Sequence, residues 1–324
     1  MIKIIHIKED MPGGTENYCL GLRDILSNEP ELCIEVPKIP QVNSSYLHYS
    51  YQEEILSPFI EQADIVHING YTAQGTIDAL KLAHKMGKKI VYTAHWHPFQ
   101  CLAHPFLGKM FFNLRMKELI RKYADVVTTI NNEDTEFFKK FHTNVIRIPH
   151  WQRKSFSTGS NDIARNPRMI LFVGRLDNHV KNFRQLLALE QGRYEIHCVG
   201  KGETPINRND LILHQGISDE ELCLLYHKAS LLVAPSKYEA FSFAALEALS
   251  AGTPVVMSER VRIADYLDGI CGYSIYKYGD SADFVHKVSE TIGKTVDTKE
   301  IDRRFNPNEI AQKYKKLYMS LIQQ

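Results

Sequence analysis

Two glutamates, Glu239 and Glu247, stand eight residues apart in the second half of the chain, and their carboxylates could bind hydroxyl groups. The apolar run 231–234 before them stops at a proline and a serine, as a buried parallel strand does where it enters a loop. The second glutamate lies in a helical run, 244–251, which Gly252 closes as a C-terminal cap. Ligands of open α/β sheets bind beyond the carboxyl ends of the strands, so this unit predicts a ligand site.

The start of that helix is suited to phosphate, because its first backbone N–H groups, on Ser242, Phe243 and Ala244, have no partner within the helix. Glu247 cannot bind phosphate, but it can accept hydrogen bonds from the two vicinal hydroxyls of a ribose. Glu239, further out, could hold a sugar hydroxyl. Phosphate, ribose and sugar together indicate a nucleotide-sugar. The same pattern also fits an ordinary α/β unit with two solvent-facing glutamates.

This stretch resembles the signature of the retaining glycosyltransferases of sequence family 4 (glycosyltransferase group 1). The resemblance implies an α/β protein of GT-B fold: two facing Rossmann-like domains with parallel sheets, and a C-terminal helix that crosses back to the first domain. The family pattern P-S, E-G-F-G, E-A and G-x-P-V-V stands here as Pro235-Ser236, Glu239-Ala240-Phe241-Ser242, Glu247-Ala248 and Gly252-Thr253-Pro254-Val255-Val256. Alanine and serine replace two common glycines, and since both are small, the phosphate-binding loop is expected to survive.

Length and charge limit the alternatives. A chain of 324 residues fits two domains of about 150 residues each. We expect an N-terminal acceptor domain over 1–151, a linker over 152–168, a nucleotide-sugar domain over 169–306 and a crossover helix over 307–324. A net charge of +1 argues against a nucleic-acid binder. With no CxxC spacing, no apparent signal peptide and no spanning apolar run of about 18 residues, we expect a cytoplasmic protein.

Gly13 and Gly14 lie between the apolar run 1–7 and a helical run from 17 to 26. Two glycines at this point allow a tight turn and a close backbone approach, and a tight turn alone would explain them. The family has a G-G-x-E element that lines the interdomain cleft, and the stretch 13–16 is similar to it. The resemblance therefore implies that the two glycines are cleft residues.

His95 and His97 are the candidate histidines. Both follow the predicted strand 88–94, and a histidine at the carboxyl end of a strand is well placed for a site. Most lone histidines are structural or exposed, and the residues themselves do not separate these two. The family has a histidine after this strand that contacts the donor sugar, so the resemblance favours His95.

The stretch 104–122 combines apolar bulk with five cations and one acid. Its large apolar residues in the first half are Phe106, Leu107, Met110, Phe111, Phe112 and Leu114. An interfacial helix on an anionic membrane has this composition. A core helix with a solvated basic face fits the pattern as well. Some family members that build lipid-linked glycans have such a segment, so a peripheral contact with an anionic membrane surface stays open.

The second domain begins with an apolar strand that ends at Gly174, followed by Arg175 and Lys181. A guanidinium and an ammonium can neutralise a leaving diphosphate, although exposed loop cations are common. The family's G-R-L…K element is similar to this stretch, which is one residue longer here. Gly200 matches the family's G-x-G element near the nucleotide.

The resemblance implies a retaining enzyme that moves a hexose from a nucleoside-diphosphate sugar, with a UDP-sugar favoured, to a hydroxyl of a glycan or glycolipid acceptor. Its implied catalytic residues are His95, Arg175, Lys181 and Glu239, and its implied donor-binding residues are Gly13, Gly14, Gly174, Arg175, Lys181, Gly200, Phe241, Ser242, Phe243 and Glu247. In the mechanism usually proposed for this fold, the leaving phosphate oxygen helps to deprotonate the acceptor. The chain has no metal-binding D-x-D motif, so we expect no metal and no other cofactor.

Three other functions compete with transfer. A nucleotide-sugar epimerase shares the fold but needs acid and base groups around the sugar. A polymerising enzyme like glycogen synthase is conceivable for a longer chain. A non-catalytic nucleotide-sugar-binding homologue is the alternative without activity. Lipopolysaccharide or other surface-polysaccharide assembly is the setting that the resemblance favours.

Overall fold

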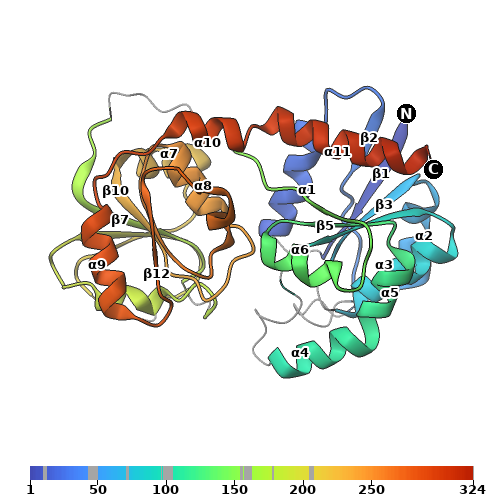
Figure 1. Cartoon of the computed structure of the whole chain (residues 1–324), viewed down its shortest axis with the longest axis horizontal. Coiled ribbons are helices and arrows are strands. Elements are labelled where there is room, and N and C mark those ends of the chain that lie inside the picture. The colour runs from blue at the N-terminus through green and yellow to red at the C-terminus, as the bar shows by residue number, and fades with distance from the viewer. Residues whose placement is uncertain are drawn as a thin grey trace. The chain divides into compact units, whose positions relative to one another are not determined.

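The computed structural model describes the whole chain except residues 10–12, 43–49, 71–72, 96, 98–104, 154–155, 157–162, 177–178, 204–207 and 324. It divides into two compact units, Met1–His150 together with Pro307–Gln324, and Trp151–Asn306 (Figure 1). Each unit is built on a six-stranded sheet in which every pairing is parallel. The expected α/β class is therefore confirmed.

The first sheet has the strand order β2-β1-β3-β4-β5-β6. Its strands are β1 (Ile2–Ile7), β2 (Leu32–Glu35), β3 (Ile65–Gly70), β4 (Lys89–Ala94), β5 (Val126–Thr129) and β6 (Val145–Arg147). The strand order reverses between β1 and β3, and in open parallel sheets such a switch point is where ligands bind. The predicted glycine turn follows β1, and β3 itself ends at Asn69-Gly70.

The helices of the first unit are α1 (Gly14–Ile25), α2 (Glu53–Glu61), α3 (Gln74–Lys85), α4 (Pro105–Phe111), the π-helical turn η1 (Phe112–Met116), α5 (Lys117–Tyr123), α6 (Asn132–Lys139) and α11 (Pro307–Ile322). One face of the sheet packs apolar strand residues such as Val66 and Val127 against residues of α3 and α5. The last helix, α11, returns to this unit and lies beside α1, as the fold class predicts (Figure 1).

The second sheet has the order β12-β11-β10-β7-β8-β9. Its strands are β7 (Asn166–Val173), β8 (Glu195–Val199), β9 (Leu211–His214), β10 (Ala229–Ala234), β11 (Val255–Ser258) and β12 (Tyr273–Tyr276). Counted within the unit, this is the order 3-2-1-4-5-6 of a dinucleotide-binding Rossmann sheet, with its switch point between β7 and β10.

Around the second sheet lie α7 (Asp219–Lys228), α8 (Phe243–Ser250), α9 (Ser281–Thr291), α10 (Thr298–Arg304) and the 3₁₀ turns η3 (Phe183–Ala188) and η4 (Arg262–Tyr266). The helix α7 starts with a capping box, in which Ser218 and Glu221 bond each other's backbone N–H groups. Gly252 has φ +74 beyond the end of α8, the left-handed conformation that a C-terminal glycine supplies.

Three local features differ from the sequence-based expectation. β12 and α10 carry too little apolar periodicity to be predicted, because both are short and largely half-exposed or exposed. β7 begins at Asn166, inside the predicted linker. Residues 105–122 of the stretch 104–122 do not form one regular helix, because the π-helical turn η1 interrupts it.

Candidate functional site

The switch point of the second sheet brings together four of the residues of interest. Lys181 Nζ lies 2.9 Å from Glu239 Oε1, and the same oxygen accepts a hydrogen bond from Ser236. Ser236 and Glu239 follow the end of β10, and Lys181 follows β7. A side chain on Gly174 would meet the Lys181 stem at 3.2 Å, so the lysine lies directly over the end of β7. The predicted phosphate cation and the predicted sugar carboxylate are therefore an ion pair in this structure.

Gly200 keeps the ends of β7 and β8 in contact. A Cβ on Gly200 would stand 1.9 Å from the carbonyl oxygen of Gly174, which no real structure tolerates. The two loops are also joined by hydrogen bonds from Gly174 N to Val199 O (2.9 Å) and from Leu176 N to Lys201 O (3.0 Å). The structure thus gives Gly200 a packing reason to be glycine, next to its predicted place near the nucleotide.

The first turn of α8 is built with a strained residue. Ser242 is its N-cap, with φ +127 and ψ 97, a backbone conformation that belongs to glycine. Its hydroxyl accepts a long hydrogen bond of 3.4 Å from Ala245 N. The glycine that the family commonly has at this position therefore has a conformational reason.

Phe241 enters the turn from a buried position. Its ring packs near those of Phe305 and Tyr266, with centroids 5.7 and 6.1 Å away. Its ring is part of the packing of the second unit, so only its backbone could serve a phosphate. Phe243, half-buried, is the first residue of the helix.

Glu247 is enclosed, although the sequence favoured a carboxylate open to ribose. Arg153 donates from Nε (2.9 Å) and from Nη2 to Oε1, and Tyr226 donates to Oε2 at 2.9 Å. The side chain of Glu247 is 5% exposed. Burial raises the pKa of this carboxyl, and the hydrogen bonds from Arg153 and Tyr226 oppose that rise. A ribose at Oε1 would have to replace the guanidinium.

Two arginines of the predicted linker belong to this unit's packing. Besides Glu247, Arg153 contacts Asp219 (3.2 Å) and lies 4.4 Å over the Phe156 ring. Arg165 donates to the carbonyls of Ala229 (2.6 Å) and Ala251 (3.0 Å), at the C-terminal end of α8. The sequence offered no signal for either role, because a lone arginine in a polar stretch reads as solvent-exposed.

Arg175 has an exposed side chain directly after Gly174, at the same end of β7. The second sheet thus assembles Gly174, Arg175, Lys181, Gly200 and Glu239 at its carboxyl edge. Glu247 lies one turn inside the helix that starts beyond β10, with Arg153 over it.

In the first unit, His95 is buried beyond β4 and bonds Asn69 through Nε2 (3.0 Å). Its ring lies edge-on to Tyr18 at 4.6 Å and stacks near His150 at 6.4 Å. Burial lowers the pKa of His95 well below its ordinary value, and His150 and His6 lower it further. The ring is therefore neutral at pH 7. Asn69 was visible in the sequence as a polar residue at a strand end, which is the signal that could have found it.

His97, the competing candidate, is also buried but packs on Phe137 of α6 at a ring distance of 5.0 Å. Gly13 and Gly14 lie at the exposed start of α1, and a Cβ on either would meet nothing within 4 Å. Packing therefore gives no reason for these two glycines, in contrast to Gly200.

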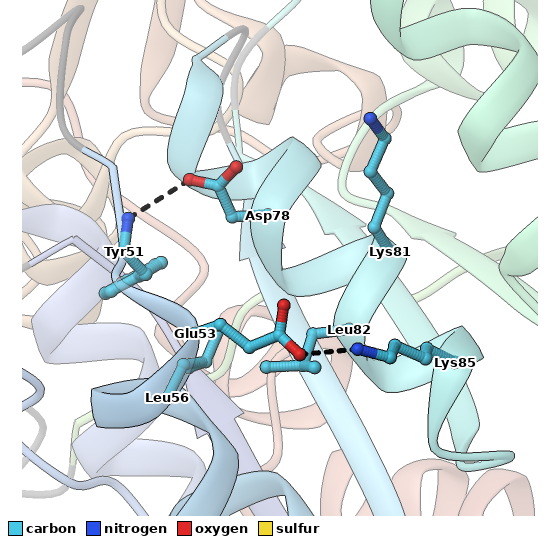
Figure 2. Close-up of a pocket in the computed structure, with 7 residues that line it drawn as sticks. All are labelled: Tyr51, Glu53, Leu56, Asp78, Lys81, Leu82 and Lys85. Carbon is cyan, nitrogen blue, oxygen red and sulfur yellow. Dashed lines mark hydrogen bonds and ion pairs between the residues drawn. The ribbon is translucent and has the colours of Figure 1, made fainter.

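Figure 2 shows a pocket between α2 and α3 that holds none of the predicted residues. It is lined by Tyr51, Glu53, Leu56, Asp78, Lys81, Leu82 and Lys85. Lys85 Nζ lies 2.6 Å from Glu53, and Asp78 accepts from the backbone N–H of Tyr51 at 3.1 Å. These charges are engaged with protein partners, so the pocket gives no reason to move the site there.

Within the described part of the chain, no group of three or more histidine, cysteine, aspartate or glutamate side chains is arranged to hold a metal ion. Among the same residues, no helix has the length and apolar character needed to cross a membrane.

Comparison with known proteins finds a family match within the second unit. Residues 167–294 match the family described as "Glycosyl transferases group 1". An uncharacterised glycosyltransferase (MJ1607) of Methanocaldococcus jannaschii is 33% identical over 33% of this chain and 31% of its own length. The GDP-mannose:cellobiosyl-diphosphopolyprenol alpha-mannosyltransferase of Xanthomonas campestris is 26% identical over 62% of this chain and 57% of its own length. The lipopolysaccharide 1,2-N-acetylglucosaminetransferase of Salmonella typhimurium is 32% identical over 40% of this chain and 41% of its own length. The chain thus spans less than two thirds of each of these three relatives.

The fold extends over the whole chain. The structure of Anabaena Alr3699/HepE, solved in complex with UDP and glucose, superposes with a TM-score of 0.78 over 99% of this chain and 100% of its own, at 14% identity. This likeness identifies the two-sheet α/β fold as GT-B. The matched domain and the names of the relatives support a glycosyltransferase.

Proposed function

We propose that this chain, which carries a glycosyltransferase group 1 domain, transfers a hexose from a nucleoside-diphosphate sugar to an acceptor hydroxyl with retention at the anomeric carbon. The observation that carries the proposal is the Lys181–Glu239 pair, 2.9 Å apart over Gly174 at the switch point of the second sheet. An ammonium and a carboxylate that neutralise each other without substrate can each take a matching partner from a donor, phosphate for the lysine and a sugar hydroxyl for the glutamate.

The other donor contacts follow from the same unit. Arg175, exposed beside Gly174, and Lys181 hold the diphosphate, and the backbone N–H groups at the start of α8 add donors to it. Ribose hydroxyls take the place of Arg153 on Glu247. When the sugar leaves, the bond from its anomeric carbon to the diphosphate breaks, and the acceptor oxygen forms the new bond. The acceptor proton passes to the departing phosphate oxygen, so no protein nucleophile and no metal take part.

A UDP-sugar is the first donor to test, because the Anabaena neighbour was solved with UDP and glucose. A lipid-linked or lipopolysaccharide acceptor is the first acceptor class, because two relatives are named for a diphosphopolyprenol and a lipopolysaccharide substrate. In the first unit, Gly13, Gly14 and His95 face that acceptor.

Nucleotide binding tests the donor site. UDP, GDP and ADP, each with and without its common sugars, are added to the wild type, to Glu247→Gln and to Glu290→Gln, an exposed glutamate of the same unit as the control. A ligand at about a hundredfold excess over its Kd stabilises the fold by about 2.7 kcal/mol. We expect one nucleotide to raise the melting temperature of the wild type and of the control but not of Glu247→Gln.

Turnover separates the possible activities. Release of free nucleotide from the donor, increased by acceptor, supports transfer, whereas interconversion of the sugar without nucleotide release would indicate an epimerase. No melting shift with any nucleotide would contradict the proposal altogether.

We also propose that the first unit contacts an anionic membrane through the α4 stripe, defined as Phe106, Leu107, Met110 and Leu114. These four side chains are 77%, 54%, 47% and 74% exposed. Their neighbours Lys109 and Arg115 are exposed too. Phe112, from the same predicted segment, is fully buried in the core instead. The segment therefore combines a core side with an outer side suited to a lipid interface.

Vesicle sedimentation tests this contact. We expect binding to vesicles that contain phosphatidylglycerol, weaker binding to pure phosphatidylcholine, and at least tenfold loss in the double variant Phe106→Ser/Leu114→Ser, because each large apolar side chain contributes about 1.5–3 kcal/mol when buried. Leu224→Ser, a 46% exposed leucine of the second unit, is the matched control. Equal binding of wild type and double variant would contradict the proposal.

A further inference from the structure

Asn69, at the end of β3, is held in one orientation by its neighbours. Its amide nitrogen lies 3.0 Å from the carbonyl oxygen of His67 and 3.4 Å from that of Ile7, and 3.1 Å from His6 Nδ1. Carbonyl oxygens only accept hydrogen bonds. If the amide were turned over, its own oxygen would face two carbonyl oxygens, so the nitrogen must point toward them and the oxygen Oδ1 away.

This orientation decides where His95 carries its proton. Asn69 Oδ1 lies 3.0 Å from His95 Nε2, and since an amide oxygen only accepts, Nε2 must be the donor. A neutral imidazole has one N–H, so the other nitrogen, Nδ1, is left as an acceptor. We infer that Asn69 is a positioning residue that fixes His95 as the neutral Nε2–H tautomer, so that Nδ1 accepts a hydrogen bond from a substrate hydroxyl.

The surroundings of the ring favour the neutral form. Among the described residues, the titratable groups that face His95 are Tyr18 of α1 (4.6 Å between rings), His150 after β6 (6.4 Å), His6 of β1 and His67 of β3. None of them is an acid that would stabilise an imidazolium. An imidazole with a lone pair directed to the substrate binds a hydroxyl and repels a phosphate oxygen, which needs a donor. His95 therefore suits a hydroxyl group and not a phosphate oxygen.

The inference rests on the proposed function for the identity of the hydroxyl, but its test does not need activity. The full-length protein is labelled with ¹⁵N-histidine, and the ring nitrogens are measured by NMR between pH 6 and 8, with His95→Gln to assign the signals. We expect a pyrrole-type signal for Nε2 and a pyridine-type signal for Nδ1 over the whole range. A proton on Nδ1, or a charged ring at pH 7, would overturn the inference even if nucleotide binding and transfer were intact.

Asn69→Leu is the sharper variant. Leucine has the same branched shape but no acceptor for the Nε2 proton, so the proton is no longer held on that nitrogen. We expect the Nδ1 signal to lose part of its pyridine character and donor turnover relative to wild type to fall at least tenfold. Thr128→Val, buried on the same face, is the control, with both readouts unchanged.

An unchanged tautomer of His95 in a folded Asn69→Leu protein would overturn the inference. Should this variant fail to fold, the tautomer measured in the wild type decides. If the wild type showed no donor turnover at all, the proposed function would be contradicted instead. Failure of the inference and failure of the proposed function are therefore distinguishable.

Discussion

The two sheets have the same number of strands and the same parallel pairing, but they differ in the side chains that they bury. One face of the first sheet buries polar side chains, whereas the central strands of the second bury mainly apolar side chains on both faces. Strands of the first sheet bury His6, His67, Asn69, Thr93 and Thr128 on one face. The central strands of the second bury aliphatic and aromatic side chains on both faces, among them Leu171, Phe172, Leu231, Leu232 and Val256. The half-buried His197 and His214 of the second sheet lie on β8 and β9, outside the central pair β7 and β10.

The polar face of the first sheet fastens α1 and α11 by directional bonds. Tyr18 of α1 donates to Tyr314 of α11 at 2.7 Å, and Tyr318 of α11 lies 2.7 Å from His67 Nδ1. The other nitrogen of His67 bonds Thr93, which bonds Thr128. Such a network specifies one helix position, whereas apolar packing tolerates small shifts. Each buried polar group that loses its partner, however, destabilises the fold. The difference predicts that the first unit is the more sensitive to acid and to single polar changes.

Acid should produce the largest difference between the units. Burial lowers the pKa of His6 and of His150 to about 3, and the pKa values of His67 and His95 are also well below the ordinary value. The unfolded chain binds these protons below about pH 6.5 and the folded one does not, so stability present above pH 6.5 is lost as the pH falls. Each residue contributes a loss of about 2 kcal/mol between pH 7 and 5.

Hydrogen exchange followed by mass spectrometry resolves the strands of each unit and measures this loss. We expect protection of β1, β3 and β4 to fall between pH 7 and 5 by more than that of β7 and β10, after correction for intrinsic exchange. His6→Gln should make the loss in the first unit smaller. Equal acid sensitivity of the two units would mean that the buried histidines of the first unit cost no more than His197, His214 and His227 of the second, whose pKa values are also lowered by burial.

Adding a methyl group should affect the glycine turns of the two units differently. Gly200→Ala places Cβ against the Gly174 carbonyl and should destabilise the second unit by about 3 kcal/mol. Gly13→Ala, with nothing within 4 Å and an extended φ of 163°, should change the stability by less than about 0.5 kcal/mol. Urea unfolding of both variants measures the contrast. A tolerated Gly200→Ala would show that the loops after β7 and β8 can separate.

Two buried tyrosines test the polar network against the apolar core. Tyr318→Phe leaves His67 Nδ1 without its partner and should cost about 1–3 kcal/mol. Tyr276→Phe in the second unit removes only a long 3.4 Å bond to the Pro235 carbonyl and should cost less than about 1 kcal/mol. Thermal unfolding compares the pair, and similar losses would argue that the network of the first unit adds nothing beyond packing.

The smallest effect concerns the turn before α8. Ser242→Gly relieves a strained φ of +127°, which should stabilise the folded state by about 1–3 kcal/mol. Loss of the serine cap destabilises it by about a few tenths of a kcal/mol, and the greater freedom of glycine in the unfolded chain by about 0.5–1 kcal/mol. We expect a net gain of about 1 kcal/mol in urea unfolding. Ser242→Ala keeps the strain and loses the cap, so it should be less stable than the wild type. No gain in the glycine variant would show that this backbone is unstrained.

Sequence patterns predicted most of the fold, because buried parallel strands and capped helices have local signals. The strand that ends before Pro235 and the glycine cap Gly252 after α8 are examples, and both are confirmed. The environment of Glu247 had no local signal, since its partner Arg153 is 94 residues away and reaches it only through packing. The pairing of Lys181 with Glu239 is likewise a property of the strand order. The roles of the site residues in binding and catalysis stay predictions.

The π-helical turn η1 decides which side of its segment meets the outside. Gly108, Phe112, Met116 and Ile120 are all buried at intervals of four residues, although an α-helix repeats every 3.6 and would drift by about 120° over that length. The wider turn absorbs the drift, as a single inserted residue does. Deleting one residue between 112 and 116 would therefore rotate the α4 stripe by about 100°. The direction in which the outer apolar surface of the first unit points therefore depends on the number of residues in one helical turn, and not on the identity of any one side chain.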